Sequence, residues 1–116
     1  MNGFADNIRP YVDAELRAAR ADAAHEFHHL ERAHVLAQAS TREHVRVHWS
    51  MLRYALRTRD AREFAGQLLR ITAAATKTFI GFVPTGNTGG TNVSALRPMP
   101  LDPELAAIIA RAREKP

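Results

Sequence analysis

Apolar residues recur at steps of three or four positions along the first third of the chain, from Val12 to Ala37. This spacing places them on one face of an α-helix, because a helix turns about 100° per residue. Pro10 precedes the stripe and is tolerated in the first turn of a helix. The pattern therefore predicts one long helix over about residues 10–38. The stripe consists of Val12, Leu16, Ala19, Ala23, Phe27, Leu30, His34 and Ala37.

Two capping signals mark the starts of the next helices. Each places a short polar residue three positions before a glutamate, as in a capping box. They are Ser40 with Glu43 and Asp60 with Glu63. The helical period resumes behind each signal and predicts helices over about 41–57 and 61–80. Gly81 is a natural end for the second of these, since glycine readily adopts the conformation that follows a helix.

Residues 81–101 carry turn formers and no helical period, so we expect a long irregular loop rich in glycine, asparagine and proline. Asp102 and Pro103 form a helix start and predict a short helix over about 103–114. Short links between helices favour antiparallel packing. The sequence thus predicts an all-α fold: a three-helix antiparallel bundle with this loop and a short C-terminal helix, with residues 1–116 as a single domain.

Composition and charge narrow the possible partners. The chain has no cysteine, which rules out disulfides and thiolate ligands. Its net charge of +4 invites a nucleic-acid interpretation. However, four arginines share one face of the second predicted helix, and no aromatic residues lie between them to stack on bases. This pattern indicates a solvated face, so we expect no nucleic-acid partner. The four are Arg42, Arg46, Arg53 and Arg57. No apolar run reaches about 20 residues and the N-terminus does not resemble a signal peptide, so we expect a cytoplasmic protein with no membrane partner.

The six histidines all lie within the first two predicted helices. His34 belongs to the apolar stripe, and Glu31 lies about 60° from it around the helix. His44 and His48 are one turn apart on the next helix. His34 and His44 lie about five residues before and after the intervening turn. If the two helices pack antiparallel, these side chains are expected at the same height.

Imidazole and carboxylate groups suit Zn, Cu, Fe or Ni. A cation would also offset the cost of burying a glutamate between helices. The sequence therefore predicts one transition-metal ion whose ligands are Glu31, His34, His44 and His48. Other polar residues nearby are expected to act as a further ligand or to fix a histidine tautomer by hydrogen bonding. These are Gln38, Glu63 and Gln67.

Other interpretations of these residues stay open. Without a metal, His34 and His48 would hydrogen-bond Glu31 or Gln38 in a buried polar network. Glu31 and His34 also match one half of the ferritin-like di-iron motif, ExxH, but the second half is missing, which favours a mononuclear site. The glycine-rich loop is expected to be either a structural lid or an anion-binding nest. Its candidate residues are Asn87, Thr88, Gly89 and Gly90.

Several segments together resemble the bacterial family called domain of unknown function 3703. They are residues 29–38 (His-Leu-Glu-Arg-Ala-His-Val-Leu-Ala-Gln), 44–49 (His-Val-Arg-Val-His-Trp), Gly66-Gln67, and Pro84 to Gly90. The resemblance covers most of the chain and implies a short helical protein without an established activity. It also implies a loose association with metal resistance. The positions to which it directs attention are Glu31, His34, His44, His48 and Asn87.

Three functional hypotheses follow. The first is transition-metal handling or resistance, by sequestration or delivery, with no catalytic residue. The second is a metal-dependent enzyme that uses an open coordination position, with Glu63 as general base. The third is a metal-free module that dimerises through its helix faces, with an apolar surface as the interface of a homodimer.

Overall fold

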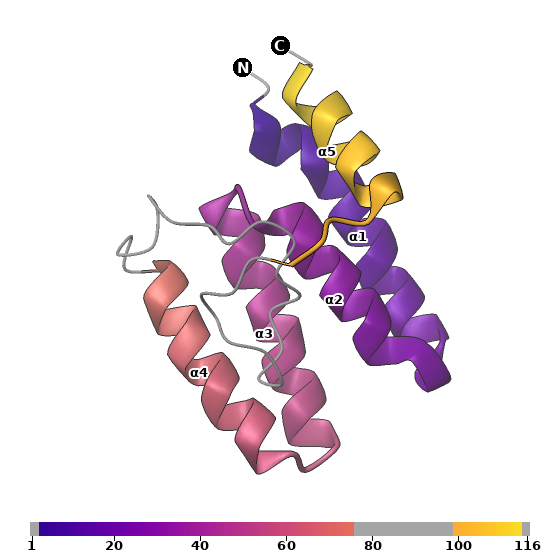
Figure 1. Ribbon diagram of the computed structural model, residues 1–116. Helices are drawn as coiled ribbons and strands as arrows, with labels where there is room; N and C mark the ends of the chain where they lie inside the picture. Colours follow the sequence, from indigo (N-terminus) through magenta and orange to yellow (C-terminus); the bar gives the residue numbers. More distant parts are fainter. Residues whose placement is uncertain (1–2, 76–98, 115–116) are drawn as a thin grey trace.

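The computed structural model describes residues 3–75 and 99–114. Within these residues the secondary structure is helical and contains no strand, which confirms the all-α prediction. The elements, in chain order, are α1 (Phe4–Ala21), a short 3-10 helix η1 (Ala23–His25), α2 (Glu26–Ala37), α3 (Thr41–Arg57), α4 (Ala61–Ala75) and α5 (Pro103–Glu114). Figure 1 shows their arrangement.

The long helix predicted over residues 10–38 is two helices, α1 and α2, joined by η1. The backbone leaves the helical region at Asp22, where φ is −129° and ψ is 84°. The Asp22 carboxylate accepts a hydrogen bond from Nδ1 of His25 at 3.1 Å and stabilises the turn. No glycine or proline marks this break. Because α1 and α2 both bury their apolar stripe in the same core, the spacing of apolar residues continues across the turn and conceals it.

The first helix also begins earlier than predicted, at Phe4, so that Pro10 lies inside it. Ile8 and Val12 are fully buried and extend the apolar face of α1 toward its N-terminus. With α1 and α2 separate, four α-helices and the short η1 precede residue 76 in the described part of the chain. The predicted three-helix bundle is therefore not confirmed, whereas the all-helical class is.

The remaining helix starts agree with the sequence. The bounds of α3 and α5 are the predicted ones. The Ser40 hydroxyl accepts from the backbone N–H of Glu43 at 3.3 Å, and Asp60 caps α4 in the same way at 3.0 Å. The second half of the Ser40 capping box is replaced, because the Glu43 carboxylate pairs with arginine side chains instead. The predicted end of α4 and the predicted loop, including Asn87, Thr88, Gly89 and Gly90, lie outside the described residues.

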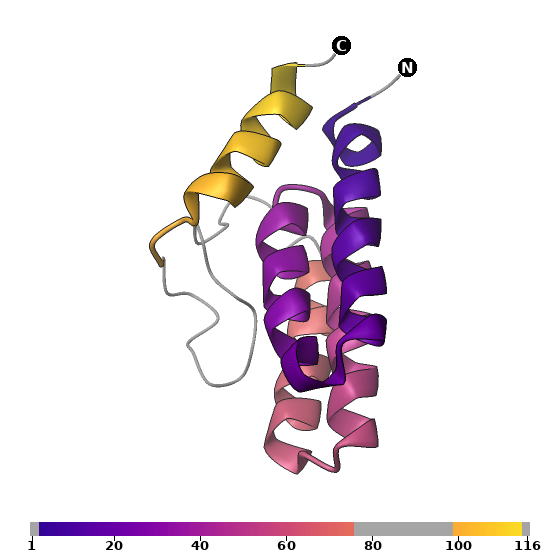
Figure 2. The ribbon, with the colours of Figure 1, turned by 90° about the vertical axis from the view of Figure 1, so that its right-hand side faces the viewer.

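Helices α1 to α4 run alternately up and down, and each of the first three packs against the next one in the sequence (Figures 1 and 2). Helices α1, α2 and α3 contact one another and enclose the core. Among the described helices, α4 packs against α3 alone. The largest fully buried apolar side chains are Ile8, Leu36, Met51, Val12 and Val47.

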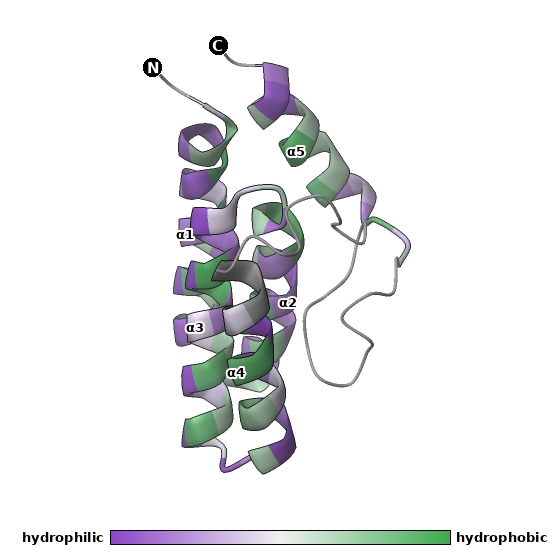
Figure 3. Ribbon diagram, turned by 90° about the vertical axis from the view of Figure 1, so that its left-hand side faces the viewer, coloured by the Kyte–Doolittle hydropathy of each residue, from purple (hydrophilic) through white to green (hydrophobic). Residues whose placement is uncertain are grey.

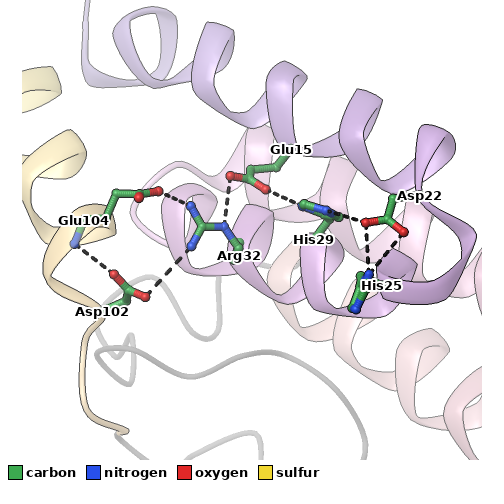
Figure 4. A network of polar contacts seen from close by, with 7 residues as sticks. All are labelled: Glu15, Asp22, His25, His29, Arg32, Asp102 and Glu104. Carbon is green, nitrogen blue, oxygen red and sulfur yellow. Dashed lines mark hydrogen bonds and ion pairs between the residues drawn. The ribbon is translucent and has the colours of Figure 1, made fainter.

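Helix α5 packs against α1 and α2, so that the end of α5 lies close to the start of α1 (Figure 1). Its apolar residues Leu105 and Ala112 are buried, and Asn7 Nδ2 donates to the carbonyl of Ala112 at 2.9 Å. Arg32 of α2 joins Glu15 of α1 to the N-terminal residues of α5 (Figure 4). This network holds α5 against the α1–α2 hairpin.

Some large apolar side chains stay exposed on α3 and α4: Trp49, Leu56, Leu68 and Leu69. Figure 3 shows hydrophobic positions on the visible side of both helices. Formation of a homodimer through such a face stays a prediction. No helix within the described residues combines the length and apolar character needed to cross a membrane.

Candidate metal centre

Three histidines meet where α2 turns into α3. His34 lies in the last turn of α2, and His44 lies in the first turn of α3 with His48 one turn later. Residues 38–40 connect the helices and bring these turns to the same height, as predicted from the sequence. His34 and His48 are almost fully buried, and His44 is half-buried.

The three Nε2 atoms form a nearly equilateral triangle. They are separated by 3.0 Å between His34 and His44, 3.1 Å between His34 and His48, and 3.0 Å between His44 and His48. In a tetrahedral zinc site with Zn–N distances of about 2.0–2.1 Å, the ligating nitrogens lie about 3.3–3.4 Å apart. The triangle therefore needs to expand by only a few tenths of an ångström to hold such an ion above its centre.

Hydrogen bonds alone cannot satisfy this triangle. A protonated ring nitrogen donates a hydrogen bond and a bare one accepts it. Among three nitrogens in mutual contact, at least one pair must be of the same kind, two donors or two lone pairs. Such a pair repels, and burial in a medium of low dielectric constant strengthens the repulsion. A single cation that accepts all three lone pairs removes this conflict.

The electrostatics keep two of these imidazoles neutral. Burial lowers the pKa of His44 to about 4 and that of His48 to about 3, because a charged ring would lose its hydration. Repulsion from His44 contributes further to the lowered pKa of His48. Neutral imidazole is the form that binds metals, so no proton has to be displaced from these two rings at neutral pH.

Two predicted partners lie behind His48. Gln67 of α4 is fully buried, and its Oε1 accepts a hydrogen bond from Nδ1 of His48 at 2.5 Å. Its Nε2 in turn donates to Oε2 of Glu63 at 2.5 Å. Glu63 is itself buried. These contacts reach the opposite side of the His48 ring from Nε2, so both residues support the triangle from behind.

The other predicted ligand candidates lie differently. Among the described residues, the group whose ligand atoms all lie within 4.8 Å of one another consists of His34, His44 and His48. Glu31 is half-buried one turn before His34 and is not part of this group. Gln38 is buried at the end of α2. Coordination by Glu31 or Gln38 stays a prediction.

His25 and His29 belong to a separate polar network that links η1, α1 and α2 (Figure 4). His29 Nδ1 donates to Oε1 of Glu15 at 2.9 Å, and exposed His25 contacts Asp22. Sequence reasoning missed the contact between His29 and Glu15, because it requires α1 and α2 to be separate helices. It also missed that Glu43 is fully buried. The only signal was its position between two arginines that lie one residue before and three residues after it.

Together, the fold and this cluster define a small protein, helical throughout its described residues, with a largely buried cluster of three histidines. The chain belongs to the protein family of unknown function DUF3703, whose sequence profile matches residues 6–109. The resemblance found in the sequence is thereby confirmed. No curated protein and no solved structure matches the chain.

Proposed function

We propose that the protein binds one divalent transition-metal ion through the Nε2 atoms of His34, His44 and His48, and that it sequesters or delivers this metal. The observation that carries the proposal is the triangle of Nε2 atoms, 3.0–3.1 Å apart. Three contacts of this kind cannot all be hydrogen bonds, whereas a single cation satisfies all three nitrogens.

The donor set indicates the class of metal. Three neutral imidazoles suit Zn(II), Cu(II), Ni(II) and Fe(II), and disfavour Mg(II) and Ca(II), which prefer oxygen ligands. Affinity for such sites generally increases from Fe(II) through Ni(II) to Cu(II), with Zn(II) below Cu(II). We therefore expect Cu(II) and Zn(II) to bind more tightly than Fe(II) in vitro.

Three protein ligands leave one position of a tetrahedral ion open. Glu31, water or a group from an acceptor protein are the candidates for that position. The same ligand count occurs in catalytic zinc sites, which keeps a metal-dependent enzyme as the alternative. Against Glu63 as its general base, the Glu63 carboxylate is engaged by Gln67 on the far side of His48. This arrangement favours metal handling over catalysis.

The test is elemental analysis of untagged protein that is purified without chelator and then incubated separately with Zn(II), Cu(II), Ni(II) and Fe(II). We expect about one ion per chain in the wild type and loss of the ion in His34→Ala/His48→Ala. The matched control is His25→Ala/His28→Ala, which removes two exposed histidines and should keep the metal. Absence of Zn(II), Cu(II), Ni(II) and Fe(II) from folded wild-type protein after incubation would reject the proposal.

Glu31→Gln determines the fourth ligand. The substitution keeps the size of the side chain and removes its charge. Because Glu31 lies outside the triangle, we expect its effect on Zn(II) affinity to be smaller than that of any single histidine-to-alanine change. An equally large loss would place Glu31 in the coordination sphere.

A further inference from the structure

A chain of buried polar side chains leads from α4 to the back of the histidine triangle. Glu63 and Gln67 are one turn apart on α4, with exposed fractions of 7% and 0%, and His48 is 1% exposed. The contacts run from Glu63 Oε2 to Gln67 Nε2, and from Gln67 Oε1 to His48 Nδ1, both at 2.5 Å. Buried polar groups that are linked in series orient one another.

Chemistry fixes the direction of this chain. The Glu63 carboxylate accepts hydrogen bonds, so Gln67 turns its NH₂ group toward it. The amide oxygen of Gln67 is then left facing His48. Since this oxygen only accepts, the proton of the neutral His48 ring must lie on Nδ1. Nε2 of His48 consequently carries a lone pair that points into the triangle.

We infer that Gln67, oriented by Glu63, is a positioning residue that locks His48 in the tautomer required for metal binding. The inference rests on the proposed function in one respect: that the lone pair on Nε2 of His48 binds a metal ion. The tautomer itself is a property of the metal-free protein. Through this lock, α4 contributes to a site whose ligands all come from α2 and α3.

The amide between the carboxylate and the ring also limits how much charge reaches the site. Where a carboxylate contacts a metal-binding histidine directly, it raises the basicity of that ligand. Here Glu63 is one side chain further away, and His48 would bind as a neutral imidazole. Such a site holds a cation less tightly than one with a direct carboxylate contact, which suits a protein that passes its metal on.

Two variants separate positioning from packing. Gln67→Leu keeps approximately the volume of the side chain and removes the acceptor. The exchanged pair Glu63→Gln/Gln67→Glu restores both hydrogen bonds, because the new glutamine donates to the new carboxylate and this carboxylate accepts from His48. The matched control is Leu69→Ala, an exposed position on the same helix. Circular dichroism verifies that each variant stays helical.

The first measurement is the ¹⁵N–¹H correlation spectrum of the histidine side chains in metal-free protein at about pH 7.5, where neutral rings predominate. It distinguishes protonated from bare ring nitrogens. We expect His48 to carry its proton on Nδ1 in the wild type, in the exchanged pair and in Leu69→Ala. In Gln67→Leu we expect a mixture of tautomers or a proton on Nε2. A wild-type proton on Nε2, or an unchanged tautomer in Gln67→Leu, overturns the inference.

The second measurement is Zn(II) affinity by competition with a chromophoric chelator. We expect Gln67→Leu to weaken binding by about 10–100-fold, the usual effect of removing such a partner. The exchanged pair should bind at least as tightly as the wild type. If the wild type binds no metal but shows the Gln67-dependent tautomer, the lock stands and the proposed function fails. If Gln67→Leu binds Zn(II) like the wild type, the function stands and the lock fails.

Discussion

The three histidines of the triangle do not have equivalent surroundings. His34 and His48 are buried to within a few per cent, and His48 has Gln67 behind it. His44 is half-buried and is the most accessible member of the triangle. We therefore expect an ion to enter and leave past His44, while His34 and His48 form the fixed part of the site.

The lowered pKa values predict how the metal-free protein responds to acid. The pKa of histidine in an unfolded chain is about 6.5, whereas burial lowers the pKa of His44 to about 4 and that of His48 to about 3 in the folded protein. Between these values the unfolded chain binds more protons than the folded protein, so the free energy of unfolding should decrease as the pH falls below about 6.5. Above about pH 7 both states are neutral, and these two residues should contribute no pH dependence.

Urea denaturation of the metal-free protein at about pH 7.5 and about pH 5 tests this expectation. The comparison is His44→Gln/His48→Gln, in which neither position titrates. Its free energy of unfolding should decrease less between the two pH values than that of the wild type. Equal decreases would show that these rings are not held neutral by burial.

At the scale of helices, the sequence was informative where a capping residue begins a helix. Ser40, Asp60 and Asp102 each accept from a backbone N–H in the first turn, and each lies at the predicted place. The break at Asp22 has no such signal. Apolar spacing reports which residues face a core, and it does not report whether the chain has reversed direction between them.

The same distinction explains what was predictable about the site. His34 and His44 were expected at one height because they are equally far from a short turn, and this depends on one pair of adjacent helices. Whether Glu31 also faces that site depends on the exact rotation of α2. The order of contacts from Glu63 through Gln67 to His48 depends on side-chain direction, which helical spacing does not define.

A buried charge connects α1 to α3. Glu43 has an exposed fraction of 0%, and its carboxylate pairs with Arg42 and Arg46. Those arginines reach Asp6 and Asp13 on α1 at 3.0 and 2.7 Å. Glu43→Ala would remove the carboxylate that pairs with both arginines and would leave a cavity in its place. We expect the free energy of unfolding to decrease by on the order of 3 kcal/mol.

Chemical denaturation measures this loss, and Glu104→Ala is the control because Glu104 is largely exposed and also pairs with an arginine. Exposed pairs contribute about 0–1 kcal/mol. Because Glu43 lies outside the triangle, folded Glu43→Ala should still bind one Zn(II) ion. Similar destabilisation by the two variants would mean that burial adds little to the Glu43 pairs.

At the scale of the whole molecule, the proposed metal centre links helices α2, α3 and α4 and, within the described residues, has no direct link to α5. Its ligands join α2 to α3, and Gln67 extends the connection to α4, which among the described helices packs against α3 alone. Helix α5 lies elsewhere, held by Arg32 and by its contacts with α1 and α2. A bound ion stabilises the folded state by about 2.7 kcal/mol when its free concentration is 100 times Kd.

This arrangement predicts that Zn(II) slows amide hydrogen exchange unevenly. Local opening of α4 or of the α2–α3 turn would break the centre or its hydrogen bonds, so exchange through such openings should slow when the ion is bound. Fraying of α5 leaves the centre intact, so amide exchange in α5 should change least.

Exchange measured by mass spectrometry with and without Zn(II) tests this pattern, and His34→Ala/His48→Ala should show no Zn(II) effect. If Zn(II) slows exchange equally in α5 and α4, the ion acts only by suppressing global unfolding. If Zn(II) does not slow exchange in α4, the connection of α4 to the centre through Gln67 is contradicted.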